Sequence, residues 1–156
     1  MKILECSQLI EMFDGGYKYL KANKTYVDSL NVFPVPDGDT GTNMSLTMAS
    51  AIKEIKDGKI YEINDVLNAY ARGALKGARG NSGVILSQII KGICKSLADE
   101  PVINTRAFAK AFGLAREIAY NAVTKPKEGT ILTVIRYIAE NAVTIANKNN
   151  SFITFF

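Results

Sequence analysis

Phe33-Pro34-Val35-Pro36-Asp37-Gly38-Asp39-Thr40-Gly41 is the stretch that decides how this chain folds, because it interrupts a sequence that is helix-like nearly everywhere else. Two prolines separated by one residue favour an extended backbone, and the glycines that follow favour a tight turn. A second break, Gly77-Ala78-Arg79-Gly80-Asn81-Ser82-Gly83, lies further along the chain. Together the two breaks hold five of the twelve glycines, and we expect function to be found there.

Apolar residues recur at helical spacing on both sides of these breaks, and no segment shows the alternation of a strand bounded by hairpin turns. The sequence therefore predicts an all-α fold. Asn64 and Thr105 are the expected N-caps of two of the helices. The expected helical ranges are 7–21, 42–56, 64–76, 84–98, 105–122 and 129–143.

Composition narrows the class of protein. With 156 residues, 47% of them apolar, the chain can bury one sizeable core, so a single domain is expected. A net charge of +4 is too diffuse to indicate a nucleic-acid partner. No apolar stretch approaches the roughly 20 residues of a membrane span, and the N-terminus lacks the features of a signal peptide. These observations predict a soluble, cytoplasmic protein.

The reactive side chains are few. The two cysteines, Cys6 and Cys94, cannot form a disulfide framework. Because the sequence has no histidine, a His-ligated zinc ion and a Ser-His-Asp triad are both excluded. Any chemistry must therefore use carboxylates, hydroxyls, amides and cations.

Asp37 and Asp39 flank a glycine directly before an expected helix. If that turn brings the two carboxylates together, they form the usual first shell of Mg²⁺, which prefers oxygen ligands. The competing interpretation is structural: Asp37 closes a turn, and Asp39 or Thr40 caps the helix. An EF-hand is excluded, because Thr42 and Met48 stand where its glycine and glutamate are required. The residues alone leave the metal and capping interpretations open.

The second break has glycines three residues apart, directly before another helix. Small residues and the helix N-terminus would suit a phosphate group, although neither the Walker nor the dinucleotide-binding pattern is present. A helix C-cap, a turn and an N-cap at Asn81 or Ser82 explain the same residues. A Mg²⁺-nucleotide would bind both breaks at once, the metal ion at the first and the phosphates at the second. This combination favours nucleotide binding over two purely structural turns.

At these residues the chain resembles a known family. Residues 30–44, 77–88 and 125–134 look like the three signature blocks of the bacterial fatty acid kinase catalytic subunit, in the order of its N-terminal nucleotide-binding domain. That domain is similar in turn to the nucleotide-binding subunit of dihydroxyacetone kinases. The resemblance extends from about residue 2 to residue 147.

The resemblance implies an antiparallel eight-helix barrel that binds ATP and two Mg²⁺ ions at one rim. Asp37 and Asp39 match its metal-binding acids, and Asn31 stands near a third acid, offset by one residue. Arg79 is either a charge stabiliser at the reaction centre or a solvated cation at a helix end. The residues expected at the nucleotide are Thr40, Thr42, Asn43, Gly80, Asn81, Ser82, Gly83, Gly129 and Thr130.

The implied reaction transfers the γ-phosphoryl group of ATP to the carboxylate of a fatty acid, which a separate fatty-acid-binding protein presents. The acceptor is already ionised near neutral pH, so no histidine base is required. Two alternatives remain: a nucleotide-binding module without turnover, and a kinase of dihydroxyacetone or a similar small hydroxyketone. The Asn-x-Phe-Pro-x-Pro run before Asp37 favours the fatty acid branch.

One departure from the family concerns the C-terminal part of the sequence. Family members continue with further helices, including a Val-Asp-x-Gly-Gly block, whereas residues 149–156 do not resemble that continuation. We therefore expect a kinase domain over 1–148 with about six of the eight helices, followed by an atypical tail. An incomplete barrel would expose apolar stripes on its flanking helices, which predicts oligomerisation or aggregation.

Overall fold

The computed structural model describes residues 2–32, 35–58, 62–148 and 150–156. Within these ranges the chain is all-α, as predicted, with six long helices, one short one and no strand. The helices are α1 (Cys6–Ser29), α2 (Thr40–Asp57), α3 (Ile63–Lys76), α4 (Gly80–Ala98), α5 (Thr105–Asn121), α6 (Ile131–Lys148) and α7 (Phe152–Phe155).

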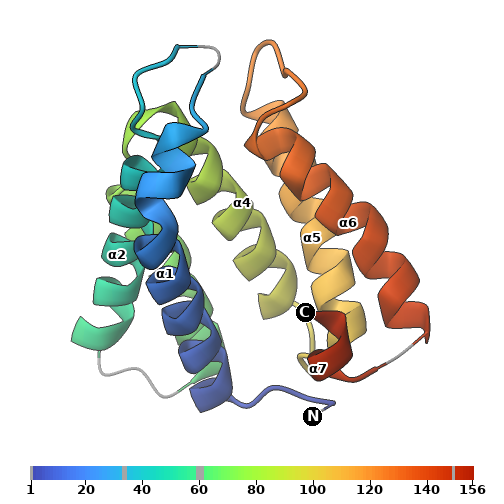
Figure 1. Cartoon of the computed structure of the whole chain (residues 1–156). Helices are drawn as coiled ribbons and strands as arrows, with labels where there is room; N and C mark the ends of the chain where they lie inside the picture. Colours follow the sequence, from blue (N-terminus) through green and yellow to red (C-terminus); the bar gives the residue numbers. More distant parts are fainter. Residues whose placement is uncertain (1, 33–34, 59–61, 149) are drawn as a thin grey trace.

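The six long helices alternate in direction, and each packs against the helix that follows it in the sequence (Figure 1). Helix α4 also packs on α2 and α6. The two ends of the series, α1 and α6, stand apart in Figure 1, as expected for an incomplete antiparallel barrel. This alternation places the loops after α1, α3 and α5 at the same end of the bundle.

The first helix is longer than predicted. It was expected to end near Lys21 but continues to Ser29, so Tyr26 belongs to α1. The glycine pair at 15 and 16 lies inside this helix without breaking it. Packing against α2 and α3 explains the extension, because tertiary contacts supply most of the stability of a protein helix. Of the extended path expected over residues 33–36, residues 33 and 34 lie outside the described part of the chain.

Several predicted caps are displaced. The N-cap of α5 is Asn104, whose side chain accepts a hydrogen bond from the Ala107 N–H at 3.0 Å, and Thr105 is already helical. Helix α3 is preceded by Glu62, with Asn64 in its first turn. Helix α4 begins at Gly80 rather than at residue 84, so neither Asn81 nor Ser82 is its N-cap. Compared with the expected ranges, α3 begins one residue earlier and α4 four residues earlier, while α5 begins at the expected residue.

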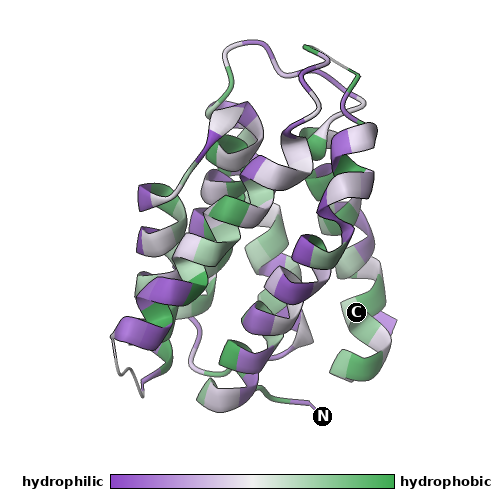
Figure 2. Ribbon diagram, turned by 60° about the vertical axis from the view of Figure 1, so that its left-hand side comes forward, coloured by the Kyte–Doolittle hydropathy of each residue, from purple (hydrophilic) through white to green (hydrophobic). Residues whose placement is uncertain are grey.

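The core lies on the inward faces of the long helices. Figure 2 shows hydrophobic and hydrophilic residues in alternating bands along each helix, the pattern of an amphipathic bundle. Helices α4 and α5 pack closely. A Cβ atom on Gly92 of α4 would lie 2.5 Å from the Cα of Ala115, so the two backbones nearly touch.

Both flanking helices expose large apolar side chains. On α1, Tyr19 and Tyr26 are exposed, and on α6 the side chains of Val134 and Tyr137 are more than half exposed. These residues fit the exposed apolar surface expected of an incomplete barrel. The oligomerisation that we expect from it stays a prediction.

None of the helices in the described ranges combines the length and the apolar character that crossing a bilayer requires.

Candidate functional site

The acidic loop between α1 and α2 is organised by Asn31. Its Nδ2 donates hydrogen bonds to Asp37 Oδ1 at 2.7 Å and to the Val35 carbonyl oxygen at 3.0 Å. Its Oδ1 accepts a hydrogen bond of 2.7 Å from the Thr40 hydroxyl. Gly38 has a φ of 64°, which is the left-handed conformation expected of this glycine. One amide thus joins the exposed Asp37 to the first residue of α2.

Asp39 is the N-cap residue of α2, but its side chain makes no capping hydrogen bond. Its backbone carbonyl accepts the Asn43 N–H at 2.8 Å, so the backbone turns into the helix without help from the carboxylate. The prediction that Asp39 caps α2 is therefore correct for the position of the residue. It is wrong for the side chain, which does not cap the helix. Among the described residues the Asp39 carboxylate makes no capping hydrogen bond or ion pair, so it can take another partner.

Asp28, near the end of α1, caps α2 from outside the loop. Its two carboxylate oxygens accept hydrogen bonds from the Thr42 backbone N–H at 2.9 Å and from the Thr42 hydroxyl at 2.8 Å. These contacts tie together the two ends of the acidic loop. Burial pushes the pKa of Asp28 upward, but the hydrogen bonds from Thr42 and from the Gly41 N–H outweigh it and lower the pKa below its ordinary value.

Asp28→Ala should lower the free energy of unfolding by about 1–2 kcal/mol at pH 7, since it removes the hydrogen bonds that Thr42 donates to a charged, partly exposed carboxylate. Asp28→Asn, which keeps one acceptor, should cost less. Because folding lowers the pKa of Asp28, its contribution is present above the ordinary pKa of about 3.9 and is lost as the pH falls through the folded value. Urea denaturation at pH 7 and pH 3 should show the difference between wild type and variant shrinking in acid. An equal difference at both pH values would contradict this role.

The glycine turn between α3 and α4 rests directly on α2. Gly80 has a φ of 59°, and a Cβ atom there would collide with the side-chain amide of Asn43. A Cβ atom on Gly83 would collide with the Thr47 hydroxyl. The three-residue spacing of the glycines is therefore explained by close packing on α2. The same packing brings the N-terminus of α4 beside the first turns of α2.

Arg79 is the N-cap residue of α4, and its side chain is exposed. Its backbone carbonyl accepts the Gly83 N–H at 3.0 Å, while in the described part of the chain its guanidinium makes no ion pair. Asn81 and Ser82 follow in the first turn of α4, where backbone N–H groups lack partners within the helix. Such N–H groups suit an anion. The binding of a phosphate by this segment stays a prediction.

The third loop, between α5 and α6, carries Gly129 and Thr130. The Gly129 N–H donates to the Thr133 hydroxyl at 2.8 Å, and the Thr130 hydroxyl donates to the Lys127 carbonyl oxygen at 2.8 Å. The Thr130 hydroxyl also accepts the Leu132 N–H at 3.2 Å, at the start of α6. Figure 1 shows this loop at the same end as the acidic loop, on the other side of the bundle.

Glu128 fixes this third loop to α5 and α6. Hydrogen bonds from Thr133, Arg136 and Tyr120, at 2.6, 3.0 and 2.9 Å, outweigh burial and hold its pKa at about 2. The carboxylate therefore stays ionised at neutral pH. The loop that presents Gly129 is thereby held by contacts to both neighbouring helices.

The donor set of the acidic loop fits Mg²⁺. In the described ranges, no three acidic or cysteine side chains are grouped as a ready-made metal site. Asp37 and Asp39 nevertheless offer two carboxylates directly before a helix N-terminus. Mg²⁺ in proteins is commonly held by one or two carboxylates together with water and substrate phosphates. Asn31 Oδ1 already accepts the Thr40 hydroxyl, so the structure gives it a positioning contact rather than a free oxygen.

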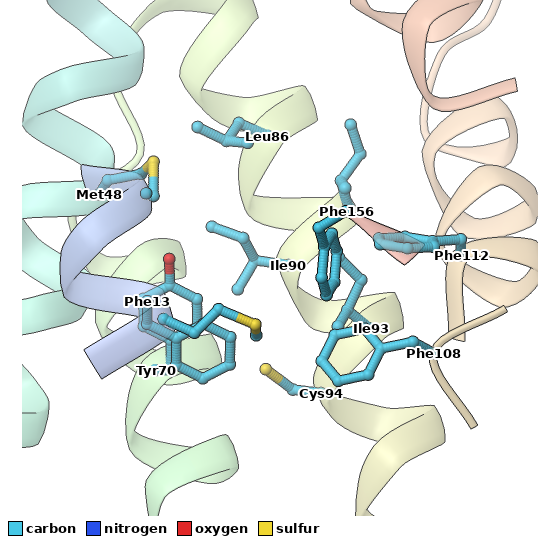
Figure 3. Close-up of a pocket in the computed structure, with 13 residues that line it drawn as sticks. Phe13, Met48, Tyr70, Leu86, Ile90, Ile93, Cys94, Phe108, Phe112 and Phe156 are labelled. Carbon is cyan, nitrogen blue, oxygen red and sulfur yellow. The ribbon is translucent and has the colours of Figure 1, made fainter. Parts of the chain in front are cut away.

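A separate apolar cavity of about 250 Å³ lies inside the bundle. In Figure 3, Phe13 of α1 lies against Tyr70 of α3, and the two rings stack with centroids 4.0 Å apart. Burial raises the pKa of the Cys94 thiol to about 12, so this cysteine is inert near neutral pH. The lining residues are Met12, Phe13, Gly16, Met48, Tyr70, Leu86, Ile89, Ile90, Ile93, Cys94, Phe108, Phe112 and Phe156. None of these described residues has a charged side chain, so this lining does not suit the phosphates of a nucleotide.

Sequence reasoning missed Asp28, Thr47 and Glu128. Each acts through partners on another helix or loop, and Asp28 and Thr47 stand in no recognisable motif. The sequence around Asp28 does not predict its capping role, because the residue whose N–H it accepts, Thr42, lies 14 residues further along the chain. Glu128 could have been noticed as the acid inside the third signature block.

Comparison of the sequence with known proteins identifies the family of this helical domain. The model of the DAK2 domain family matches residues 34–156. Uncharacterized proteins of Staphylococcus aureus strains bovine RF122 / ET3-1, USA300 and COL are each 48% identical over 143 residues. The match covers 92% of this chain but only 26% of each relative, so the chain spans about a quarter of the length of those proteins. The chain therefore belongs to the DAK2 family, a kinase-related domain of the dihydroxyacetone kinase nucleotide-binding type.

Proposed function

We propose that this domain binds Mg²⁺-ATP at the end of the bundle that carries the three loops, and that it transfers the γ-phosphoryl group to a carboxylate. The observation that carries the proposal is the Asn31 network, which holds Asp37 beside the N-terminus of α2. Close packing on α2 brings the N-terminus of α4 to the same place. Carboxylates for a cation and N–H groups for phosphates are thus side by side in a kinase-related domain.

The proposed roles of the residues follow from these positions. Asp37 and Asp39 would hold up to two Mg²⁺ ions, and the ions would neutralise charge on the phosphates. Thr40, Thr42 and Asn43 lie in the first turn of α2, and Asn81 and Ser82 lie in the first turn of α4. In the proposed complex both turns would face the phosphates. The exposed guanidinium of Arg79 would add positive charge beside the transferred group.

The proposed acceptor is the carboxylate of a fatty acid presented by a fatty-acid-binding partner protein. A carboxylate oxygen attacks the γ-phosphorus, the bond to the bridging oxygen of ADP breaks, and an acyl phosphate and ADP result. No proton has to be removed from the acceptor, because a carboxylic acid is ionised near neutral pH. This chemistry agrees with a sequence that contains no histidine.

Isothermal titration calorimetry with a non-hydrolysable ATP analogue tests nucleotide binding. We expect heat of binding when Mg²⁺ is present and none when EDTA replaces it, because the phosphates would then face uncompensated carboxylates. Binding that does not depend on the metal, or no binding at all, would reject the proposed function for this chain.

The acceptor is tested separately. ATP is supplied with a fatty acid loaded on a purified bacterial fatty-acid-binding protein, or with dihydroxyacetone, and ADP release is measured. ADP release with the loaded protein alone supports the proposed acceptor, and release with dihydroxyacetone alone supports a hydroxyketone kinase. Because the chain spans only about a quarter of its relatives, a module that binds nucleotide without turnover is the second candidate, and release with neither acceptor would favour it.

A further inference from the structure

Thr47 is a fully buried residue in the second turn of α2, directly beneath the glycine turn. Its hydroxyl donates a hydrogen bond to the Asn43 carbonyl oxygen at 2.8 Å and lies 3.4 Å from the Gly77 carbonyl oxygen. It also accepts the backbone N–H of Arg79 at 3.3 Å. One hydroxyl therefore contacts α2, the end of α3 and the residue that caps α4.

The first turn of α4 depends on this contact from a second side. Gly83 approaches so closely that a Cβ atom there would collide with the Thr47 hydroxyl. The N-cap residue and the fourth residue of α4 thus both rest on the same side chain. Thr47 therefore contributes directly to the position of the α4 N-terminus relative to α2.

We propose that Thr47 is a positioning residue, which holds the first-turn N–H groups of α4 at the right place to receive the phosphates of the nucleotide. This inference rests on the proposed function, because it assigns Thr47 to the same site. The hydroxyl touches neither metal nor nucleotide in this role. It acts by fixing the Arg79 N–H, and through it residues 80–83, against the helix that follows the acidic loop.

The helix offers a matched control. Ser45 is a buried hydroxyl on the same helix, and its Oγ has no hydrogen-bond partner in the described part of the chain. Ser45→Ala removes a buried oxygen from α2 without releasing the turn. Thr47→Val removes the hydroxyl at nearly constant volume, and Thr47→Ser keeps the hydroxyl and removes only a methyl group.

The experiment measures amide hydrogen exchange of residues 78–83 without ligand, and binding of the Mg²⁺ complex of a non-hydrolysable ATP analogue. We expect Thr47→Val to speed exchange in this segment and to weaken binding about fivefold to tenfold, the equivalent of one lost hydrogen bond. Thr47→Ser and Ser45→Ala should resemble wild type in both measurements. Circular dichroism checks the fold, and Thr47→Ala replaces the valine variant if valine prevents folding.

Two results would overturn the proposal. In the first, Thr47→Val lowers the melting temperature but leaves exchange at 78–83 and nucleotide affinity unchanged, which is a purely structural role. In the second, Thr47→Ser is as impaired as Thr47→Val, so the methyl group and not the hydroxyl matters. If wild type itself binds no Mg²⁺-nucleotide, the proposed function is wrong, and the exchange data alone then decide whether Thr47 holds the turn.

Discussion

Replacing both Asp37 and Asp39 with alanine should weaken Mg²⁺-dependent nucleotide binding by at least about 100-fold. Mutation of a residue that merely supports a metal ligand commonly costs 10- to 100-fold in metal affinity, and this change would remove the only two carboxylates of the proposed site. Calorimetric titration of the variant with the Mg²⁺ complex of the ATP analogue measures the loss.

Helix content should stay nearly unchanged in that variant. The Asp39 side chain makes no capping hydrogen bond, and Asp28 caps the first turn of α2 from α1. Asp99 is an exposed aspartate in the loop at the other end of the bundle. The variant Asp99→Ala is therefore the matched control and should bind the nucleotide like wild type. Wild-type affinity in the double variant would refute the metal role. A collapse of the circular dichroism signal would show instead that capping was the larger role of the two aspartates.

Gly41→Ala should cost about 3 kcal/mol of unfolding free energy, the largest stability effect that we expect from adding one methyl group. A Cβ atom at this position would collide with the carbonyl oxygen of Lys24 and would lie 2.9 Å from its carbonyl carbon. Both are backbone atoms of α1, so no side chain can rotate away. Helix α2 would have to move off α1, and the acidic loop between them would move too. Urea denaturation at neutral pH measures the change.

Gly113→Ala is the control for that experiment. This glycine lies within α5, and a Cβ atom there would meet no atom within 4 Å. The same substitution should therefore stabilise the protein, by up to about 1 kcal/mol, through helix propensity alone. Equal effects at the two positions would show that the close approach of α1 and α2 is not rigid.

The helices could be predicted from the sequence because each has a continuous apolar face. Their ends could not, since they depend on contacts between helices. The polar run that includes Asn23 and Lys24 looks like the end of a helix, yet α1 continues through it because its other face packs on α2. Asn104 and Thr105 are both good N-caps, and only the structure shows that the Asn104 side chain accepts the Ala107 N–H.

The candidate site was partly predictable for a similar reason. Asp37, Gly38 and Asp39 stand together in the sequence, so their local turn could be inferred. The spacing of Gly77, Gly80 and Gly83 was equally visible, but nothing in it says that Ser50, Asn43 and Thr47 lie opposite the three positions. A sequence pattern shows where side chains are small. Only the fold shows which neighbouring atoms lie so close that the side chain has to be small.

The order in which the helices pack has a consequence for how the chain acquires its structure. Each long helix packs against the next one in the sequence, so most of the core forms between segments joined by short loops. Contacts of this kind close small loops, and helical proteins dominated by them fold within microseconds to milliseconds. The bundle can therefore grow helix by helix from any adjacent pair. The hydrogen bonds from Thr42 to Asp28, which join the two ends of the acidic loop, require only that α1 and α2 have met.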